Sequence, residues 1–304
     1  MTKILISDPI AEEGVEKLDR AGFELEHQYD LTAEELKREI GKYEGIVVRS
    51  ATKLRAPILD EADNLELIVR AGVGLDNIDL DRADELGIEV RNTPEASSNS
   101  VAELALGHML ALARGIPRGT KSLKEQKWIK SELKGTELSG KTLGVIGIGR
   151  IGSLVAKKGM ALGMKAVAFD KFVDQSPMEG IKMVEKDNLL SDSDYVTLHI
   201  PFVESEGATI GEAELKKMKE SAFLINCARG GVVDEDALKK ALENEWIRGA
   251  GVDVFTEEPP QDVDLLKFDN LSLTPHVGAS TVEAQSRVGT QAADEFIDFF
   301  GKED

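Results

Sequence analysis

The stretch Gly147-Ile-Gly-Arg-Ile-Gly152 is the strongest single constraint on how this chain of 304 residues folds. An apolar run at residues 142–146 precedes it and is typical of a buried strand, and residues 150–162 have the pattern of a helix that ends near Gly163. In a βαβ unit that binds a dinucleotide, the first glycine makes a tight turn, the second admits the pyrophosphate, and the third lets helix and strand pack closely. The amino end of the helix then faces the phosphates.

The glycine spacing alone is weak support, because a chain with 28 glycines can produce it without a nucleotide site. The context is more specific. A second apolar run at 166–169 ends on Asp170, where a carboxylate is placed to hold the hydroxyl groups of a ribose. We therefore predict a dinucleotide site; an ordinary glycine-rich turn is the alternative interpretation.

Charge and composition restrict the partners. The chain has 37 basic and 56 acidic residues, a net charge of −19, which repels nucleic acids and anionic membranes, so we expect neither as a partner. No stretch approaches the ~18 uninterrupted apolar residues of a membrane span. Cys227 is the only cysteine, which excludes an internal disulfide and fits a reducing compartment. With an amino terminus that resembles no signal peptide, this predicts a cytoplasmic protein.

The hydrophobic periodicity predicts an α/β protein with two doubly wound parallel-sheet domains. Short strands are expected at 3–7, 23–28, 45–50, 65–70 and 88–92, with helices at 11–21, 32–41 and 80–87. We expect residues 1–96 to form a flavodoxin-like domain, and the final helix at 281–300 to return to it. The predicted domains are thus 1–96 plus 280–304, and a dinucleotide-binding Rossmann domain at 97–279.

The segment that joins the two predicted domains is unusually apolar. The helix from Val101 to Arg114 has apolar residues all round, so we expect it to be buried between domains or subunits. His108 lies within it and is interpreted as packed and hydrogen-bonded rather than as a ligand. Residues 115–139 are interpreted as a polar connector that serves as an arm of a homodimer.

The chemically versatile residues follow the later strands, expected at 195–200, 222–227, 249–255 and 270–274. Ligands gather at the carboxyl ends of strands in an open α/β sheet. His199 and His276 each follow such a strand, and either could be a loop histidine with a structural hydrogen bond. The acidic pair Glu257-Glu258 favours His276 as the acid–base group, because a carboxylate orients an imidazole. Arg229 offers a planar fork for a carboxylate or keto oxygen, with an ordinary ion pair as the alternative.

Four motifs together resemble those of the D-isomer-specific 2-hydroxyacid dehydrogenases. They are Gly147–Gly152, Asn226-Cys-Ala-Arg-Gly-Gly231, Asp253-Val-Phe-Thr-Glu-Glu-Pro259 and Pro275-His-Val-Gly-Ala-Ser-Thr281, and the match runs from about residue 3 to 300. The resemblance implies that Arg229, Glu258 and His276 are catalytic. It implies cofactor contacts at Gly147, Gly149, Arg150, Ile151, Gly152, Asp170, Cys227, Ala228, Asp253, Gly278 and Ala279. It implies substrate binding at Arg49, Arg70, Gly72, Val73 and Gly74, with the site in the cleft between the domains, and no metal.

The resemblance also implies a reaction. We expect NAD-dependent oxidation of a phosphorylated 2-hydroxyacid, D-3-phosphoglycerate, as a first step of serine biosynthesis. A glyoxylate or hydroxypyruvate reductase is the alternative within the family, and a non-enzymatic NAD-sensing interaction protein is the alternative outside this enzyme class. Longer family members carry a carboxyl-terminal domain that binds serine; the sequence ends at Asp304, so we expect no feedback by serine through such a domain.

Overall fold

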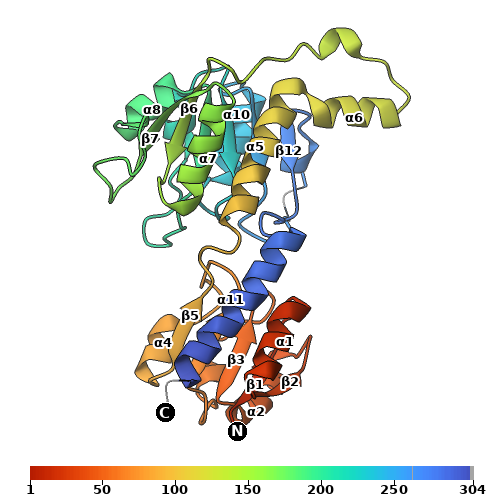
Figure 1. Cartoon of the computed structure of the whole chain (residues 1–304). Coiled ribbons are helices and arrows are strands. Elements are labelled where there is room, and N and C mark those ends of the chain that lie inside the picture. The colour runs from red at the N-terminus through yellow and green to blue at the C-terminus, as the bar shows by residue number, and fades with distance from the viewer. Residues whose placement is uncertain (262, 302–304) are drawn as a thin grey trace. The chain divides into compact units, whose positions relative to one another are not determined.

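The computed structural model describes residues 1–261 and 263–301, which form two compact units. Unit 1 comprises Met1–Ser97 and the chain from Ala279 onward, and unit 2 is Ser98–Gly278 (Figure 1). Each unit is a parallel sheet covered by helices on both faces. The predicted α/β fold class is confirmed.

Unit 1 contains a five-stranded sheet with the strand order β2-β1-β3-β4-β5. Its strands are β1 (Lys3–Ile6), β2 (Glu24–His27), β3 (Gly45–Val48), β4 (Leu67–Arg70) and β5 (Glu89–Asn92). All pairings are parallel; Ile4, for example, lies opposite Leu25 on one side and Gly45 on the other. This is the flavodoxin-like order, whose winding reverses between β1 and β3.

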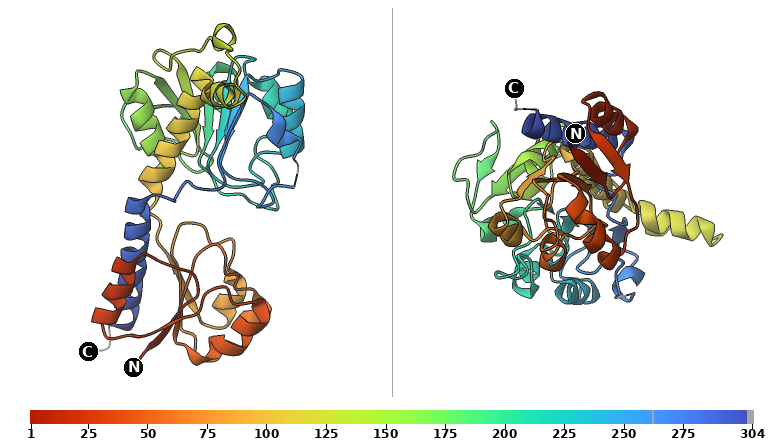
Figure 2. Two further views of the ribbon diagram at one scale, coloured as in Figure 1. Left: turned by 90° about the vertical axis from the view of Figure 1, so that its right-hand side faces the viewer. Right: turned by 90° about the horizontal axis from the view of Figure 1, so that it is seen from below.

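Helices cover both faces of this sheet, because successive strand side chains alternate between two buried faces. Ile4 and Ile6 pack with α1 (Glu12–Arg20) and α11 (Val282–Phe300), and Leu5 packs on the opposite face. That face is covered by α2 (Ala33–Glu39), α3 (Ala56–Leu59) and α4 (Leu80–Glu85). Figure 2 shows α1 and α11 side by side. The final helix therefore packs on the first sheet, and its Phe296 is fully buried there, a contribution of roughly 1.5–3 kcal/mol.

Unit 2 contains a seven-stranded parallel sheet with the order β12-β11-β10-β9-β6-β7-β8. Its strands are β6 (Thr142–Ile146), β7 (Lys165–Phe169), β8 (Lys182–Met183), β9 (Tyr195–Leu198), β10 (Phe223–Asn226), β11 (Gly249–Val252) and β12 (Leu271–Leu273). Numbered within the unit, this is the 3-2-1-4-5-6 order of Rossmann folds with one strand added. The winding reverses between β6 and β9, so a ligand site is expected beyond their carboxyl ends.

The helices of unit 2 also form two layers. On one face lie α5 (Ser98–Arg114) and α7 (Arg150–Ala161), and on the other lie α8 (Lys186–Asp192), α9 (Glu212–Lys217) and α10 (Glu235–Glu243). Met109 and Ala105 on α5 are fully buried against the sheet, whereas Leu110 is exposed. The helix is therefore buried along one side within its own unit.

Residues 115–139 contain more structure than the expected polar connector. They form helix α6 (Ile116–Lys124) and the short η2 (Lys130–Glu132), and α6 extends away from the body of unit 2 in Figure 1. Pro117 in the first turn of α6 suits a helix start, because the missing N–H would have no helical partner there. Within the described residues, none of the helices is both long and apolar enough to span a membrane.

Candidate active site

At each of the three glycines after β6, a different structural feature explains why the residue is glycine. Gly147 has a φ of 91°, and an added Cβ would lie 2.5 Å from the carbonyl oxygen of His199. At Gly152 an added Cβ would lie 1.9 Å from the Gly147 carbonyl oxygen, so the helix could not approach the strand. At Gly149, by contrast, no described atom lies within 4 Å of that position. Open space above the middle glycine is what a pyrophosphate requires.

The amino end of α7 lies beside this open space. Gly149 is the N-cap, and in the described chain no side chain caps the helix. Arg150 and Ile151 occupy its first turn, whose amides and dipole favour an anion. The residues present thus fit a dinucleotide phosphate, on both the glycine geometry and the uncapped helix end.

Asp170 follows β7, at the strand end where the sequence predicts a ribose contact. Its Oδ2 accepts the Ile148 N–H at 3.0 Å, and its Oδ1 accepts the Phe172 N–H at 2.9 Å. Each carboxylate oxygen has capacity for a second hydrogen bond, so these contacts fix the side chain without saturating it. Asp170 is therefore both attached to the glycine turn and able to accept from two neighbouring hydroxyl groups.

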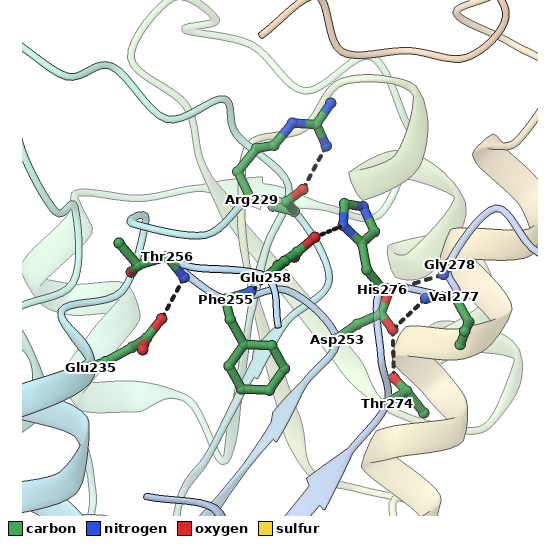
Figure 3. Close-up of polar contacts among 11 residues, drawn as sticks. Arg229, Glu235, Asp253, Phe255, Thr256, Glu258, Thr274, His276, Val277 and Gly278 are labelled. Carbon is green, nitrogen blue, oxygen red and sulfur yellow. Dashed lines mark hydrogen bonds and ion pairs between the residues drawn. The ribbon is translucent and has the colours of Figure 1, made fainter. Parts of the chain in front are cut away.

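His276 and Glu258 form a pair at the same edge of the sheet. The Nδ1 atom of His276 lies 2.7 Å from Oε2 of Glu258, and Oε1 of Glu258 accepts the Phe255 N–H at 3.1 Å. The two side chains are 45% and 39% exposed, so small molecules can reach them. Figure 3 shows the glutamate directed at the imidazole, with Arg229 on the same side of the loops. This geometry leaves Nε2 of His276 to exchange a proton with a bound molecule.

Asp253 holds the loop that carries His276. Its carbonyl oxygen accepts the His276 N–H at 2.7 Å, while its carboxylate accepts the N–H groups of Val277 at 2.8 Å and Gly278 at 2.9 Å (Figure 3). Asp253 is 1% exposed. His276 has a φ of 52°, a left-handed conformation that costs about 1–3 kcal/mol for a non-glycine residue. Asp253 thus stabilises an unfavourable backbone at the proposed proton-transfer residue.

The loop after β10 brings Arg229 beside the Glu258 loop. Asn226 accepts the Ala228 N–H with its side-chain oxygen at 3.1 Å and donates to the Arg229 carbonyl at 3.0 Å. An added Cβ at Gly230 would lie 1.9 Å from the Phe255 carbonyl oxygen, so the two loops touch through their backbones. Gly230 is therefore the residue that permits Arg229 to come this close.

Cys227 and Ala228, predicted as cofactor contacts, lie in the same loop and are both buried. Burial, assisted by the nearby Asp253 carboxylate, raises the pKa of the Cys227 thiol. The thiol is therefore neutral and unreactive at ordinary pH, and Cys227 and Ala228 offer a cofactor only their shape and backbone groups.

His199, the competing candidate, is placed differently. Its Nε2 atom lies 2.9 Å from the Thr197 hydroxyl, and its Nδ1 is buried with no hydrogen-bond partner in the described part of the chain. Burial lowers the pKa of His199 to about 3, so the ring stays neutral through the physiological range. No carboxylate orients it as Glu258 orients His276, among the residues described. His276 thus differs from His199 in being exposed and in contacting a carboxylate.

Unit 1 orders Arg49 at the point where its own winding reverses. The Asp8 carboxylate, after β1, accepts the Arg49 N–H, the Thr52 N–H and the Thr52 hydroxyl. The side-chain amide of Asn77 donates to the carbonyls of Arg49 and Thr52 at 2.8 and 2.7 Å. The Arg49 guanidinium donates to the Pro9 carbonyl at 3.3 Å. Asp8 and Asn77 are support residues that the sequence patterns did not reveal.

The loop after β4 is equally constrained. The Arg70 guanidinium lies across Gly72, because a Cβ there would be 1.4 Å from its Nη1 atom. Thr93 donates to the Gly72 carbonyl at 2.9 Å and Asn92 to the Val73 carbonyl at 2.6 Å, which fixes the turn that leads to Gly74. The last predicted cofactor residue, Ala279, begins the returning segment of unit 1, and its carbonyl accepts from Gln285.

The described residues offer no cluster of three or more His, Cys, Asp or Glu side chains that could hold a metal ion. A Rossmann sheet with an open glycine turn, an acid after its second strand and a histidine–glutamate pair defines a dinucleotide-dependent oxidoreductase.

Comparisons with known proteins place the chain within that class. Residues 106–278 match the family described as "D-isomer specific 2-hydroxyacid dehydrogenase, NAD binding domain". The chain belongs to the family of D-isomer specific 2-hydroxyacid dehydrogenases, and its cofactor is NAD, as the sequence predicts.

Individual relatives extend the match over nearly the whole chain. D-3-phosphoglycerate dehydrogenase of Methanocaldococcus jannaschii is 47% identical over 298 residues, 97% of this chain but 57% of that relative. Hydroxypyruvate reductase of Thermotoga maritima is 45% identical over 303 residues, 98% of each chain. The structure of D-lactate dehydrogenase from Aquifex aeolicus, complexed with NAD and lactic acid, matches with a TM-score of 0.86 and 32% identity, covering 98% of this chain and 95% of that one. The chain spans little more than half the length of the dehydrogenase from M. jannaschii.

Proposed function

We propose that this protein oxidises D-3-phosphoglycerate to 3-phosphohydroxypyruvate with NAD, the reaction of D-3-phosphoglycerate dehydrogenase and the first step of serine biosynthesis. The observation that carries the reaction type is the 2.7 Å contact between His276 Nδ1 and Glu258 Oε2 at the edge of a dinucleotide-binding sheet. The substrate assignment is supported by the 47% identical relative of that name.

In this proposal His276 takes the proton of the C2 hydroxyl through Nε2, because Glu258 occupies Nδ1 and stabilises the charged ring. Arg229 binds the substrate carboxylate and polarises the C2–O bond, since a guanidinium presents paired donors to such a group. NAD, when bound, would supply the hydride acceptor for C2. The proton and the hydride thus have one acceptor each, and Arg229 is one of the contacts of the carboxylate.

The remaining proposed contacts divide into cofactor and substrate groups. Gly147, Gly149, Arg150, Ile151 and Gly152 surround the pyrophosphate, and Asp170 accepts from the ribose hydroxyls; Cys227, Ala228, Asp253, Gly278 and Ala279 contact the rest of the dinucleotide. The backbone from Gly72 to Gly74 binds the carboxylate, and Arg49 and Arg70 bind the phosphate. In a chain of net charge −19, an anionic substrate needs such local cations.

A second candidate is reduction of hydroxypyruvate or glyoxylate. It is favoured by the Thermotoga maritima hydroxypyruvate reductase, which this chain matches over 98% of both lengths. The two candidates share the acid–base pair and differ in the phosphate. The two candidate functions are therefore distinguished by whether Arg49 and Arg70 bind a phosphate group of the substrate.

A substrate panel tests the proposal. We expect the highest kcat/KM with NAD for D-3-phosphoglycerate and, in reverse with NADH, for 3-phosphohydroxypyruvate. D-glycerate, D-lactate, glyoxylate and hydroxypyruvate serve as the unphosphorylated comparisons. Preference for hydroxypyruvate over its phosphorylated form would select the second candidate, and no turnover of any 2-hydroxyacid would select a non-enzymatic NAD-binding role.

We also propose a cytoplasmic homodimer formed through α5 and the arm that follows it. Support comes from apolar side chains on this segment that are unusually exposed, namely Leu110, Ile116, Leu123 and Trp128, the last at 80%. Sedimentation equilibrium should give twice the chain mass, and Leu123→Glu together with Trp128→Glu should shift the protein to monomer. A monomeric unaltered protein would refute this assembly.

A further inference from the structure

His108 is a buried polar residue on the apolar helix α5 of unit 2, and it hydrogen-bonds to two side chains. It lies in the middle of α5, is 2% exposed, and packs so closely on β11 that an added Cβ at Gly251 would lie 2.6 Å from its own Cβ. Its Nδ1 lies 2.8 Å from the Ser272 hydroxyl and its Nε2 lies 3.1 Å from the Thr274 hydroxyl. Both ring nitrogens are therefore satisfied by residues of, and just after, β12.

The hydrogen bonds beyond His108 have a single possible direction. The Asp253 carboxylate accepts from two backbone amides and from the Thr274 hydroxyl, whose oxygen lies 2.5 Å from Oδ1. Thr274 must then give its only proton to Asp253. Its oxygen accepts from His108 Nε2–H, and the neutral His108 ring accepts the Ser272 proton at Nδ1. Burial lowers the pKa of His108 against the opposing effect of Asp253, which agrees with a neutral ring.

This chain of hydrogen bonds ends on the residue that holds the His276 loop. Asp253 accepts the N–H groups of three consecutive residues, His276 with its carbonyl and Val277 and Gly278 with its carboxylate. If the Thr274 hydroxyl turned away, the carboxylate would lose one of its three donors and could rotate. The His276 backbone, already in a left-handed conformation, would then be less firmly placed.

We propose that His108 is a positioning residue for the dehydrogenase reaction: by donating to Thr274 it directs that hydroxyl onto Asp253 and so fixes the loop that carries His276. The proposal rests on the proposed role of His276 in proton exchange. It requires no contact between His108 and any bound molecule. Precise placement of an acid–base group governs turnover more than substrate binding.

Two substitutions separate the two ends of the imidazole. His108→Gln places an amide N–H close to the position of Nε2 and can still donate to Thr274, whereas His108→Asn reaches only as far as Nδ1 and contacts Ser272 alone. His108→Leu removes both contacts. We expect His108→Asn and His108→Leu to lower kcat by about tenfold, the effect of one lost hydrogen bond, with little change in KM, and His108→Gln to restore most of the loss.

Amide hydrogen exchange gives a readout that is independent of activity. In the Asn and Leu variants we expect exchange of the His276, Val277 and Gly278 amides to accelerate by about tenfold at constant pH, with the amides of α7 unchanged. Met109→Ala is the matched control, because it opens a cavity on the same buried helix without touching the network. It should lower the melting temperature while leaving the local exchange at residues 276–278 and kcat at low temperature unaltered.

Thr274→Val breaks the same series of hydrogen bonds without a change on α5. It tests the proposal if His108→Leu does not fold. It should reproduce the loss of kcat, and the double variant His108→Leu/Thr274→Val should be no worse than either single one. Equal impairment of the Gln and Leu variants, additive losses in the double variant, or unchanged exchange at residues 276–278 would overturn the proposal. Full activity of His276→Ala would instead refute the proposed function. The hydrogen-exchange results would still show whether His108 fixes the loop at residues 276–278.

Discussion

The Nδ1 atom of His276 lies 2.7 Å from Oε2 of Glu258, although 18 residues separate them in sequence. Because the carboxylate occupies one ring nitrogen, the other is the only one left for a reacting molecule. Both residues lie in loops at the carboxyl edge of the unit 2 sheet, one after β11 and one after β12. The pairing of β11 with β12 therefore brings the two loops together, and the Glu258 contact at Nδ1 leaves Nε2 facing a bound molecule.

Replacing His276 tests the proposed proton transfer. A positioned acid–base group typically contributes ~10² to 10⁴ in rate, so His276→Ala should lose that order in kcat while the Kd for NADH stays nearly unchanged. Stopped-flow turnover and fluorescence titration with NADH measure the two quantities. His199→Ala is the comparison, since its Nδ1 is buried and its Nε2 is hydrogen-bonded to Thr197. If His199→Ala abolished turnover and His276→Ala did not, the other strand end would be the catalytic one.

Arg49→Ala tests phosphate recognition. A charged hydrogen bond contributes about 1.5–3 kcal/mol, so kcat/KM for D-3-phosphoglycerate should fall by roughly 10- to 100-fold, with little change for D-glycerate. Arg55→Ala provides the control, because Arg55 is an exposed cation of the same unit that donates to the Asp76 carbonyl. Equal losses for the phosphorylated and unphosphorylated substrates would remove Arg49 from the phosphate site.

Asp170 should set the preference for NAD over NADP, because its carboxylate would repel a 2′-phosphate and accept from free hydroxyls. Asp170→Ala should narrow the ratio of kcat/KM for the two cofactors. Asp170→Asn keeps an acceptor for the Ile148 or Phe172 amide, and so separates the charge from the support of the glycine turn. An unaltered protein that used both cofactors with equal efficiency would contradict this role.

The lowered pKa of His199 predicts a dependence of stability on pH. Its pKa is lowered to about 3 in the folded protein, below the ordinary value of about 6.5, so between these values the unfolded chain binds more protons. The contribution to stability is complete above pH 6.5 and is lost as the pH falls, by about 2 kcal/mol at pH 5. Urea unfolding of the protein and of His199→Gln between pH 7 and 5 measures it. The variant should show a shallower decline, and identical slopes would refute the assignment.

Gly230→Ala tests the contact between the Arg229 and Glu258 loops. An added Cβ would lie 1.9 Å from the Phe255 carbonyl oxygen, so the loops must separate, with a loss of about 1–3 kcal/mol in unfolding free energy and a fall in kcat. Gly107→Ala is the control, since its Cβ on α5 would meet no described atom within 4 Å and alanine favours helix. A Gly230→Ala variant with unaltered turnover would show that the contact is not needed.

The sequence predicts the elements whose pattern is long or strongly apolar. The observed α1 and α11 begin and end within one residue of the predicted ranges, and at α2 the structure shows a capping box of Thr32 and Glu35, a local signal of a helix start. Besides α6, the elements β8, α8 and α3 were not predicted from the sequence. The strand β8 has only two residues, α8 buries only Leu189 and Leu190, and α3 is a single turn. Their existence depends on the sheet they pack against, which no local pattern describes.

The candidate site divides in the same way. Arg229, Glu258 and His276 follow apolar strands, and parallel topology brings strand ends together, so their neighbourhood is predictable. The partners of His108 are not, because Ser272 and Thr274 lie 164 and 166 residues away and meet it only when α5 packs across the sheet. Asp8 was likewise missed, since a single acid after a strand does not indicate which loop it will hold.

The open space above Gly149 has a consequence for how this sequence can change over generations. Replacing Gly147 or Gly152 damages the fold itself, whereas a methyl group at Gly149 meets no described atom within 4 Å. Selection for a folded chain alone would therefore retain two of the three glycines and let the middle one drift. Variants at Gly149 are removed only where selection also acts on dinucleotide binding. Retention of Gly149 among descendants therefore indicates that binding is retained, whereas retention of Gly147 and Gly152 indicates only that the fold is retained.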